Sequence, residues 1–179
     1  EFSQPQGGTV AFEKDPIDES SIAETVECDV VVCGAGMAGV SAAVSASENG
    51  LKTILLEKGS TFAARGTEIA AIGDRAHSEA GIELDPEEFL DDAMSTAHFR
   101  CDREVWLRWI ERSGEALDWG REQVGDACGA FFCKGGNTRF AGVATWGTGV
   151  RLENGIPSFV EAMANKAASN GADVRYETP

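Results

Sequence analysis

A glycine-rich hexapeptide at residues 34–39, G-A-G-M-A-G, has the clearest chemical meaning in this sequence, because it matches the spacing G-x-G-x-x-G. In this pattern the first glycine permits a tight turn, the second lets the backbone approach a pyrophosphate, and the third lets a helix pack closely on a strand. The N–H groups at the start of that helix attract phosphate oxygens. The spacing therefore predicts a dinucleotide site at Gly34, Ala35, Gly36, Met37, Ala38 and Gly39.

Glu57 is the second candidate in this site, because it ends the next apolar run along the chain. A carboxylate at that position accepts hydrogen bonds from both ribose hydroxyls of an adenosine, and it disfavours a 2′-phosphate. NADP is therefore not the expected ligand, whereas FAD and NAD both remain open on the hexapeptide alone. The alternative without a binding function is a glycine-rich turn that has no ligand.

The elements around the hexapeptide form a β-α-β pattern. Residues 29–33 are a β-branched run typical of a strand buried on both faces, and residues 52–57 are the next strand. Between them, residues 37–49 form an alanine-rich helix that Asn49-Gly50 ends. This pattern predicts an α/β fold with a Rossmann-like parallel sheet.

The rest of the chain predicts a helical insertion and a returning unit. Residues 60–84 are interpreted as mainly loop with a short helical turn. The insertion covers about 85–124: one helix begins at Asp85-Pro86 and runs to about Phe99, and a second begins at Asp102. The second helix carries an aromatic stripe, interpreted as core, and a break is expected near Ser113-Gly114.

The last part of the chain contains one more helix and one more strand. Residues 125–155 are rich in glycine and are expected to be irregular or to form short strands. Pro157 begins a helix that Asn170-Gly171 ends, and residues 172–177 form a final strand. Residues 1–28 are interpreted as an acidic, loosely packed arm, so that the folded domain covers 29–179.

Composition excludes several classes of protein. The chain is 42% hydrophobic, and 15 Lys and Arg residues against 30 Asp and Glu residues give a net charge of −15. Such a chain is expected to repel nucleic acid and anionic lipid. No stretch approaches the roughly 20 apolar residues of a membrane-spanning helix. No signal peptide is evident, and both a cytoplasmic and an exported location remain open.

Other reactive side chains lack a recognisable spacing. The cysteines show no C-x-x-C pair, so no metal site is predicted, and Cys128 and Cys133 either form a bridge or, as we favour, remain free thiols. His77 and His98 are interpreted as structural or surface residues. H-E-x-x-H, G-x-S-x-G and Walker lysine motifs are absent from the sequence. We therefore name no catalytic residue.

Four parts of the sequence carry a resemblance to a known family. Residues 29–59, DVVVCGAGMAGVSAAVSASENGLKTILLEKG, resemble the FAD-binding segment of the fumarate reductase/succinate dehydrogenase flavoproteins. Residues 66–73, GTEIAAIG, are similar to the family's flavin loop, N-T-A-L-A-A-G-G. Residues 113–119, SGEALDW, resemble its helical pattern S-G-E-x-I-D-W-L, and the last helix and strand resemble the piece that returns to complete the FAD domain.

The resemblance implies FAD as the cofactor. Gly66 stands where respiratory members of the family carry a histidine bonded to the flavin, so we expect noncovalent FAD. Lys58 and Arg65 are neighbours of the cofactor or, equally, surface charges. The resemblance places the remaining cofactor-binding residues at the pyrophosphate, the adenosine ribose and the path to the isoalloxazine: Gly34, Gly36 and Gly39, then Glu57, then Thr67, Ala71 and Gly73.

The resemblance also implies an activity. Family members transfer a hydride from flavin N5 to an activated C=C bond of a small unsaturated, often carboxylated substrate, while an arginine supplies the proton. The equivalents of that arginine and of the carboxylate clamp are expected beyond residue 179, and an electron-donor domain or protein is an expected partner. An incomplete sheet should expose an apolar face and an unpaired edge. Two alternatives stay open: a binding module or split subunit completed by a partner chain, and an NAD-dependent domain.

Overall fold

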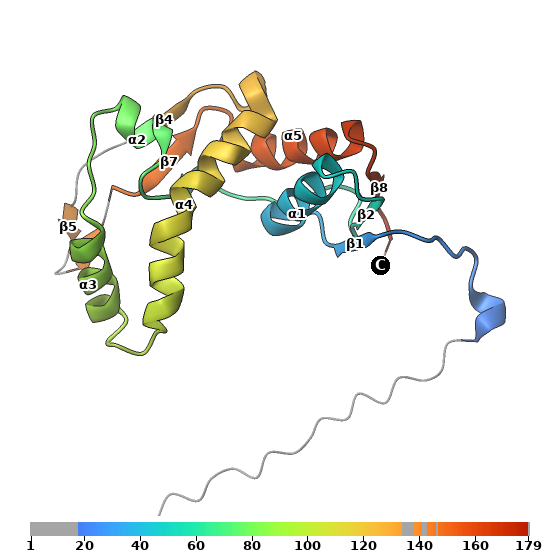
Figure 1. Cartoon of the computed structure of the whole chain (residues 1–179), viewed down its shortest axis with the longest axis horizontal. Helices are drawn as coiled ribbons and strands as arrows, with labels where there is room; N and C mark the ends of the chain where they lie inside the picture. Colours follow the sequence, from blue (N-terminus) through green and yellow to red (C-terminus); the bar gives the residue numbers. More distant parts are fainter. Residues whose placement is uncertain (1–17, 134–137, 141–142, 146, 179) are drawn as a thin grey trace, which may run out of the picture.

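The computed structural model describes residues 18–133, 138–140, 143–145 and 147–178. Figure 1 shows two groups of elements: a parallel sheet with the helices α1 and α5, and a second group that contains α2, α3, α4 and short antiparallel strands. The predicted α/β fold with a parallel sheet is confirmed. Residues 1–17 of the expected arm lie outside the described residues, and residues 18–28 are largely exposed, with the short 3-10 helix Glu19–Ser21 near their start.

The parallel sheet has the order β1-β2-β8, with β1 at Val30–Cys33, β2 at Thr53–Leu56 and β8 at Asp173–Arg175. Helices α1, Met37–Glu48, and α5, Gly155–Ser169, lie side by side over one face of this sheet (Figure 1). Their apolar residues and the central strand form much of the core, which includes Val40, Val44, Leu55, Val160 and Met163.

The prediction that the first strand is buried on both faces is wrong. Residues 29–33 were expected to be buried on both faces, but Val31 is 54% exposed and Cys33 is also exposed. Helices α1 and α5 cover one face only, and within the described residues β1 and β8 each pair only with β2. On the second face Val31 is exposed, whereas its register partner Ile54 on the central strand is only 6% exposed.

Two longer helices make up the predicted insertion. Helix α3 is Pro86–Thr96, and its N-cap Asp85 accepts hydrogen bonds from the N–H groups of Glu87 and Glu88. Helix α4, Arg103–Val124, begins after Asp102, whose carboxylate accepts from the N–H of Glu104. Both starts follow from the capping preference of aspartate.

The break expected near Ser113-Gly114 is wrong, because α4 is continuous through both residues. A Cβ on Gly114 would lie 2.7 Å from the carbonyl carbon of Gly73 and 2.9 Å from the nitrogen of Asp74. The glycine therefore serves a close approach between backbones rather than the end of a helix. The residues that Gly114 approaches lie some 40 positions earlier in the sequence, so a local sequence pattern does not reveal this close packing.

Short antiparallel strands form in two parts of the chain, at residues 68–70 and within residues 125–155. β3, Glu68–Ala70, and β4, Phe131–Cys133, flank β7, Gly149–Leu152, in an antiparallel sheet, and β5, Thr138–Phe140, pairs with β6, Val143–Thr145. The short strands expected within 125–155 are confirmed where that stretch is described, and a 3-10 helix, Gly125–Cys128, precedes them. β3 falls where a loop was expected, beside the short helix α2, Arg75–Glu79.

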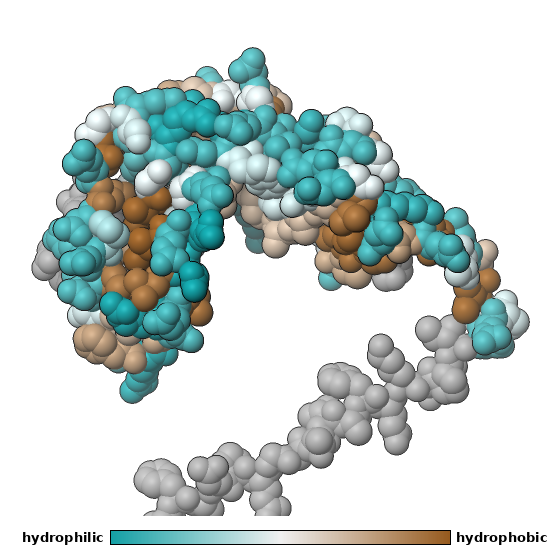
Figure 2. Space-filling view, viewed as in Figure 1, coloured by the Kyte–Doolittle hydropathy of each residue, from teal (hydrophilic) through white to brown (hydrophobic). Residues whose placement is uncertain are grey.

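The aromatic stripe lies between α3 and α4. Phe89, Trp106 and Trp109 contact one another with ring centroids 5.3 to 5.8 Å apart, and they line a cavity of about 700 Å³. Figure 2 shows hydrophobic residues gathered there. Val105 is 65% exposed, so the interpretation of this stripe as core holds only in part. Across the described residues, we find no helix with both the length and the apolar character needed to cross a membrane.

Candidate functional site

The hexapeptide forms the loop between β1 and α1. Gly34 has a φ of +99°, and its N–H donates to the carbonyl oxygen of Leu56 at 2.6 Å. A Cβ on Gly39 would collide with the carbonyl oxygen of Gly34. Glycine at these two positions therefore allows the turn and the close packing of the first turn of α1 on the end of β1.

The space beside the start of α1 is open. Gly36 is the N-cap of this helix and provides no side-chain hydrogen bond to its first turn. A Cβ on Gly36 would have only the carbonyl oxygen of Ala63 nearby, at 3.6 Å, and a Cβ on Gly34 would meet nothing within 4 Å. Such a helix start presents N–H groups and a partial positive charge, so the loop fits the phosphates of a dinucleotide.

Glu57 lies against this loop at the end of β2 and is only 6% exposed. One carboxylate oxygen accepts from the N–H of Gly59 at 2.8 Å, and the other accepts from the N–H of Ala35 at 2.7 Å. These two hydrogen bonds lower the pKa of Glu57, with the bond from Gly59 contributing most. The carboxylate is therefore ionised and fixed in place at neutral pH, and each oxygen retains a lone pair for a hydroxyl group.

A cavity of about 340 Å³ adjoins this carboxylate. It lies at the carboxyl ends of β1 and β2, the edge where open α/β sheets bind their ligands. Lys58, predicted as a neighbour of the cofactor, is exposed and lines the cavity. Thr178 also lines it and was missed by the sequence interpretation, because only the return of β8 brings it there. The lining residues are Cys33, Gly34, Leu56, Glu57, Lys58 and Thr178.

The segment of residues 66–73, predicted as the flavin loop, lies along β7 and the start of α5. The carbonyl oxygens of Gly66 and Thr67 accept from the N–H groups of Ile156 and Leu152 at 3.0 and 2.9 Å. The N–H of Ala71, which is buried, donates to the carbonyl oxygen of Thr148 at 2.9 Å. Main-chain bonds thus determine the course of this segment, while Thr67 remains exposed.

Helix α4 holds the far end of the same segment. The Ser113 hydroxyl accepts from the N–H of Ile72 at 3.0 Å, and the Asp118 carboxylate accepts from the N–H of Arg75 at 3.0 and 3.1 Å. Gly114 lies between them against the backbone of Gly73, which has a φ of +77°. The sequence interpretation noticed the S-G-E-A-L-D-W pattern but did not assign these residues a positioning role.

The hexapeptide and the chain just before the 66–73 segment lie next to each other. The N–H of Ala63 donates to the carbonyl oxygen of Ala35 at 3.3 Å, so the residues just before the 66–73 segment lie beside the hexapeptide. Arg65, predicted as a cofactor neighbour, is exposed on this connection. Met37 is half-buried and Ala38 exposed in the first turn of α1. The predicted residues therefore form two adjoining groups rather than a single pocket.

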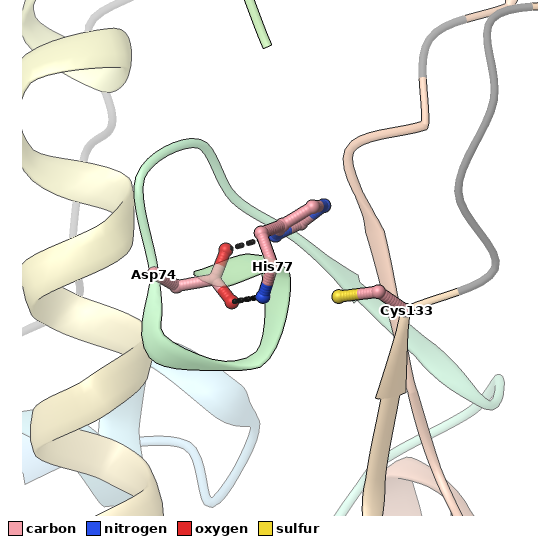
Figure 3. A group of neighbouring side chains, drawn as sticks. All are labelled: Asp74, His77 and Cys133. Carbon is pink, nitrogen blue, oxygen red and sulfur yellow. Dashed lines mark hydrogen bonds and ion pairs between the residues drawn. The ribbon is translucent and has the colours of Figure 1, made fainter. Parts of the chain in front are cut away.

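The histidines and cysteines lie apart from the 340 Å³ cavity, except for Cys33. His98 is exposed, whereas His77 is 2% exposed and hydrogen-bonded to the Asp74 carboxylate (Figure 3). Cys128 and Cys133 are free thiols, as favoured. Burial, with the negative charges of Asp74 and Glu79, raises the pKa of Cys133 to about 11, so this thiol is not a ready nucleophile at neutral pH.

The parallel sheet and the open loop at the start of α1 define a nucleotide-binding α/β domain. Residues 29–177 match the family model of the FAD binding domain, and the chain belongs to that family. FAD is therefore the cofactor, which sets aside the NAD alternative. The resemblance to fumarate-reductase-like flavoproteins is confirmed by the relatives that follow.

Two curated relatives illustrate this membership. A vinyl phenol reductase of Lactiplantibacillus plantarum is 29% identical over 121 residues, which cover 66% of this chain and 23% of the relative. A fumarate reductase (cytochrome) of Shewanella frigidimarina is 30% identical over 155 residues, which cover 84% of this chain and 26% of the relative. The chain thus spans about a quarter of the length of these two enzymes.

Two solved structures share the fold. A 3-ketosteroid-Δ4-(5α)-dehydrogenase of Rhodococcus jostii RHA1 superposes with a TM-score of 0.65 at 21% identity, over 90% of this chain and 40% of that one. The open conformation of a flavocytochrome c3 fumarate reductase also gives 0.65, at 23% identity, over 88% of this chain and 28% of that one.

Proposed function

We propose that this chain forms the cofactor-binding part of a flavin-dependent oxidoreductase that reduces an activated C=C bond in a small unsaturated, carboxylated substrate. The relatives named as vinyl phenol reductase and fumarate reductase support this reaction class, because vinyl phenol and fumarate both contain such a bond. The observation that carries the cofactor assignment is the Glu57 carboxylate, fixed and ionised at a cavity beside the open glycine loop.

In this proposal the nucleotide half of FAD occupies the parallel-sheet end of the chain. The glycine loop and the first turn of α1 bind the pyrophosphate through backbone N–H groups, since no side chain occupies the space beside Gly36. Glu57 accepts hydrogen bonds from the adenosine ribose. Lys58 and Thr178 line the same cavity and would contact the nucleotide there.

The 66–73 segment follows the flavin half, with Thr67, Ala71 and Gly73 along it. Gly66 has no side chain that could form a bond to the flavin, so the FAD is held without a covalent link. Bound and reduced, FAD supplies a hydride from flavin N5. We assign no residue of this chain to proton delivery or to the substrate carboxylate, because both ring nitrogens of His77 are engaged, by Asp74 and by the Gly147 carbonyl. Electrons reach the flavin from a donor domain or protein.

The first test is an absorbance spectrum of the purified chain with added FAD, before and after acid precipitation. Flavin bands that pass into the supernatant support noncovalent FAD. Flavin that stays in the pellet contradicts the argument from Gly66. A folded chain that takes up no FAD contradicts the assignment of the cofactor site.

A paired substitution locates the site. Gly36→Ala should leave the fold intact, because the φ of −86° and ψ of −177° suit alanine and the nearest atom is 3.6 Å away. The added methyl keeps the phosphates from the helix start, so loss of a charged hydrogen bond of about 1.5–3 kcal/mol should weaken FAD binding roughly 10- to 100-fold. Ser45→Ala, on the exposed side of α1, is the matched control. Equal FAD affinity in both variants would place the pyrophosphate elsewhere.

A second candidate is a cofactor-binding module completed by a partner chain. The open face of the parallel sheet, with Val31 at 54% exposure, favours it. Light scattering after size exclusion separates the two ideas. A stable monomer that binds FAD and melts cooperatively argues against the module, and self-association that a Val31→Lys substitution abolishes argues for it.

A further inference from the structure

Asp74, His77 and Cys133 bring three metal-ligating side chains together behind the 66–73 segment (Figure 3). Their donor atoms all lie within 4.8 Å of one another. Asp74 is the N-cap of α2, His77 lies within that helix, and Cys133 ends β4. The exposed fractions of Asp74 and His77 are 0% and 2%, and Cys133 is half-buried.

The donor types suit a borderline transition-metal cation. A carboxylate, an imidazole and a thiolate are ligands that Zn²⁺ accepts at roughly 2.0–2.3 Å, which places tetrahedral donor atoms roughly 3.3–3.8 Å apart. The present donor atoms lie within 4.8 Å of one another, and reaching that geometry requires Nδ1 of His77 and the Asp74 carboxylate to move apart. Calcium and magnesium are excluded as preferred ions, because they select oxygen ligands.

The surroundings already orient each ligand. The Nε2 atom of His77 lies 2.7 Å from the carbonyl oxygen of Gly147, so an Nε2–H group donates there. Nδ1 is hydrogen-bonded to the Asp74 carboxylate and has to exchange that bond for one to the metal. One carboxylate oxygen of Asp74 accepts from the N–H of His77 at 3.1 Å. The other oxygen contacts Nδ1 of His77 and becomes a ligand when the ion enters between them. Such outer hydrogen bonds fix the tautomer and the orientation of metal ligands.

The charge of the cluster also favours a cation. Asp74 and Glu79 both act on Cys133 as negative charges, and Arg121, which pairs with Glu79 at 3.1 Å, opposes them only in part. A divalent ion with one carboxylate, one thiolate and a neutral imidazole forms a neutral complex. The ion then takes the place of the ring proton between Asp74 and His77 and of the thiol proton.

We propose that Asp74, His77 and Cys133 form a binding site for a divalent cation of the zinc type, which ties α2 to β4. The site goes beyond the proposed function, because zinc undergoes no redox change and takes no part in hydride transfer. Asp74 directly follows Gly73, so the ion fixes the end of the 66–73 segment. Cys133 lies on a different element from Asp74 and His77, more than 50 residues further along the chain, and there is no C-x-x-C spacing, which is why the sequence showed no metal site.

Co²⁺ is the probe for the test, since a thiolate ligand gives Co²⁺ a near-ultraviolet charge-transfer band. The full chain, reduced and freed of metal, is titrated with Co²⁺ as wild type, as Cys133→Ser and as Cys101→Ser. Cys101 is the matched control, because its half-buried thiol contacts Met94 outside the cluster. Circular dichroism verifies the fold of each variant.

We expect the band, at equimolar cobalt, in the wild type and in Cys101→Ser but not in Cys133→Ser. Zn²⁺ should displace the cobalt and raise the melting temperature of the first two proteins, and its affinity for Cys133→Ser should fall at least about tenfold. A wild type without the band, or a folded Cys133→Ser that retains it, would overturn the proposal. The band does not depend on FAD, so its failure is distinct from failure of the proposed function.

Discussion

The two regions that we propose to bind FAD, the nucleotide end and the flavin end, are held in different ways. The hexapeptide and Glu57 belong to one β-α-β unit, and bonds within that unit join the loop to β2, from Gly34 to Leu56 and from Ala35 to Glu57. The 66–73 segment has partners far along the chain, including Ser113 and Thr148. A local unit thus forms the nucleotide end, whereas tertiary packing must assemble the flavin end.

We expect the two regions to respond differently to destabilising substitutions. Disturbing the local unit should unfold the parallel sheet, because its helix and strand share the main core with α5. Disturbing the flavin end should loosen the 66–73 segment while the parallel sheet remains folded, since its anchors lie on α4 and β7.

Gly39→Ala should have the largest effect. Its Cβ collides with the backbone of Gly34, which cannot move aside without separating α1 from β1. We expect a loss of about 3 kcal/mol in the free energy of unfolding, with loss of FAD binding, measured by urea denaturation. Gly36→Ala is the contrast, because it should weaken FAD binding but keep its unfolding midpoint. Equal midpoints for the two variants would contradict the packing argument.

Gly114→Ala should destabilise by about 2 kcal/mol, although alanine is the better helix former by about 1 kcal/mol. The Cβ meets the backbone of Gly73 and Asp74, so the loss should appear as faster hydrogen exchange in the 66–73 segment. Gly120→Ala, on the same helix, meets a side chain, the ring of Phe159 at 2.7 Å, and should cost less. Exchange that rises equally in β1 and β2 would show that the two regions are not separate.

Ser113→Ala removes the acceptor for the N–H of Ile72 and should cost about 1 kcal/mol, with faster exchange of that amide. Arg112→Ala, one residue earlier, removes an exposed ion pair with Glu115 and should change the free energy of unfolding less than Ser113→Ala does, because solvent screens such pairs. An Ile72 amide that exchanges at the same rate in both variants would remove Ser113 from its positioning role.

The smallest effect concerns pH. The pKa of Glu57 is lower in the folded chain than its ordinary value of 4.5, so its contribution to stability is present above that value and is lost as pH falls through the folded pKa. The difference in urea midpoint between wild type and Glu57→Gln should therefore be largest near neutral pH and vanish in acid. A difference that is independent of pH would mean that the ionised carboxylate does not support the loop.

Much of the nucleotide end could be predicted because its information is local. The glycine spacing, the β-branched run and the cap at Asn49-Gly50 lie within a few turns of one another, and the expected helix at 37–49 corresponds to α1 at Met37–Glu48. The error at Ser113-Gly114 has the opposite origin. Glycine usually weakens a helix, and only the backbone of Gly73 explains why it stands inside one here.

β3 and the burial of β1 were missed for similar reasons. β3 has only three residues, too few for a period-two pattern to be recognised in the sequence. It is a strand because it pairs with β7. Val31 lies in a run that is apolar on both sides, but burial depends on which elements cover each face of the sheet. Hydrophobic pattern indicates a strand without indicating how many of its faces are covered.

The sequence by itself determined the α/β class and the glycine loop with its acidic partner, because each depends on the types and spacing of residues close together in the chain. FAD followed from the resemblance of several segments to a known family. Only the tertiary structure decided which residues of α4 hold the 66–73 segment, that Thr178 lines the nucleotide cavity, and that Asp74, His77 and Cys133 meet. These contacts join residues tens of positions apart. Their geometry depends on how whole elements pack, which no local pattern specifies.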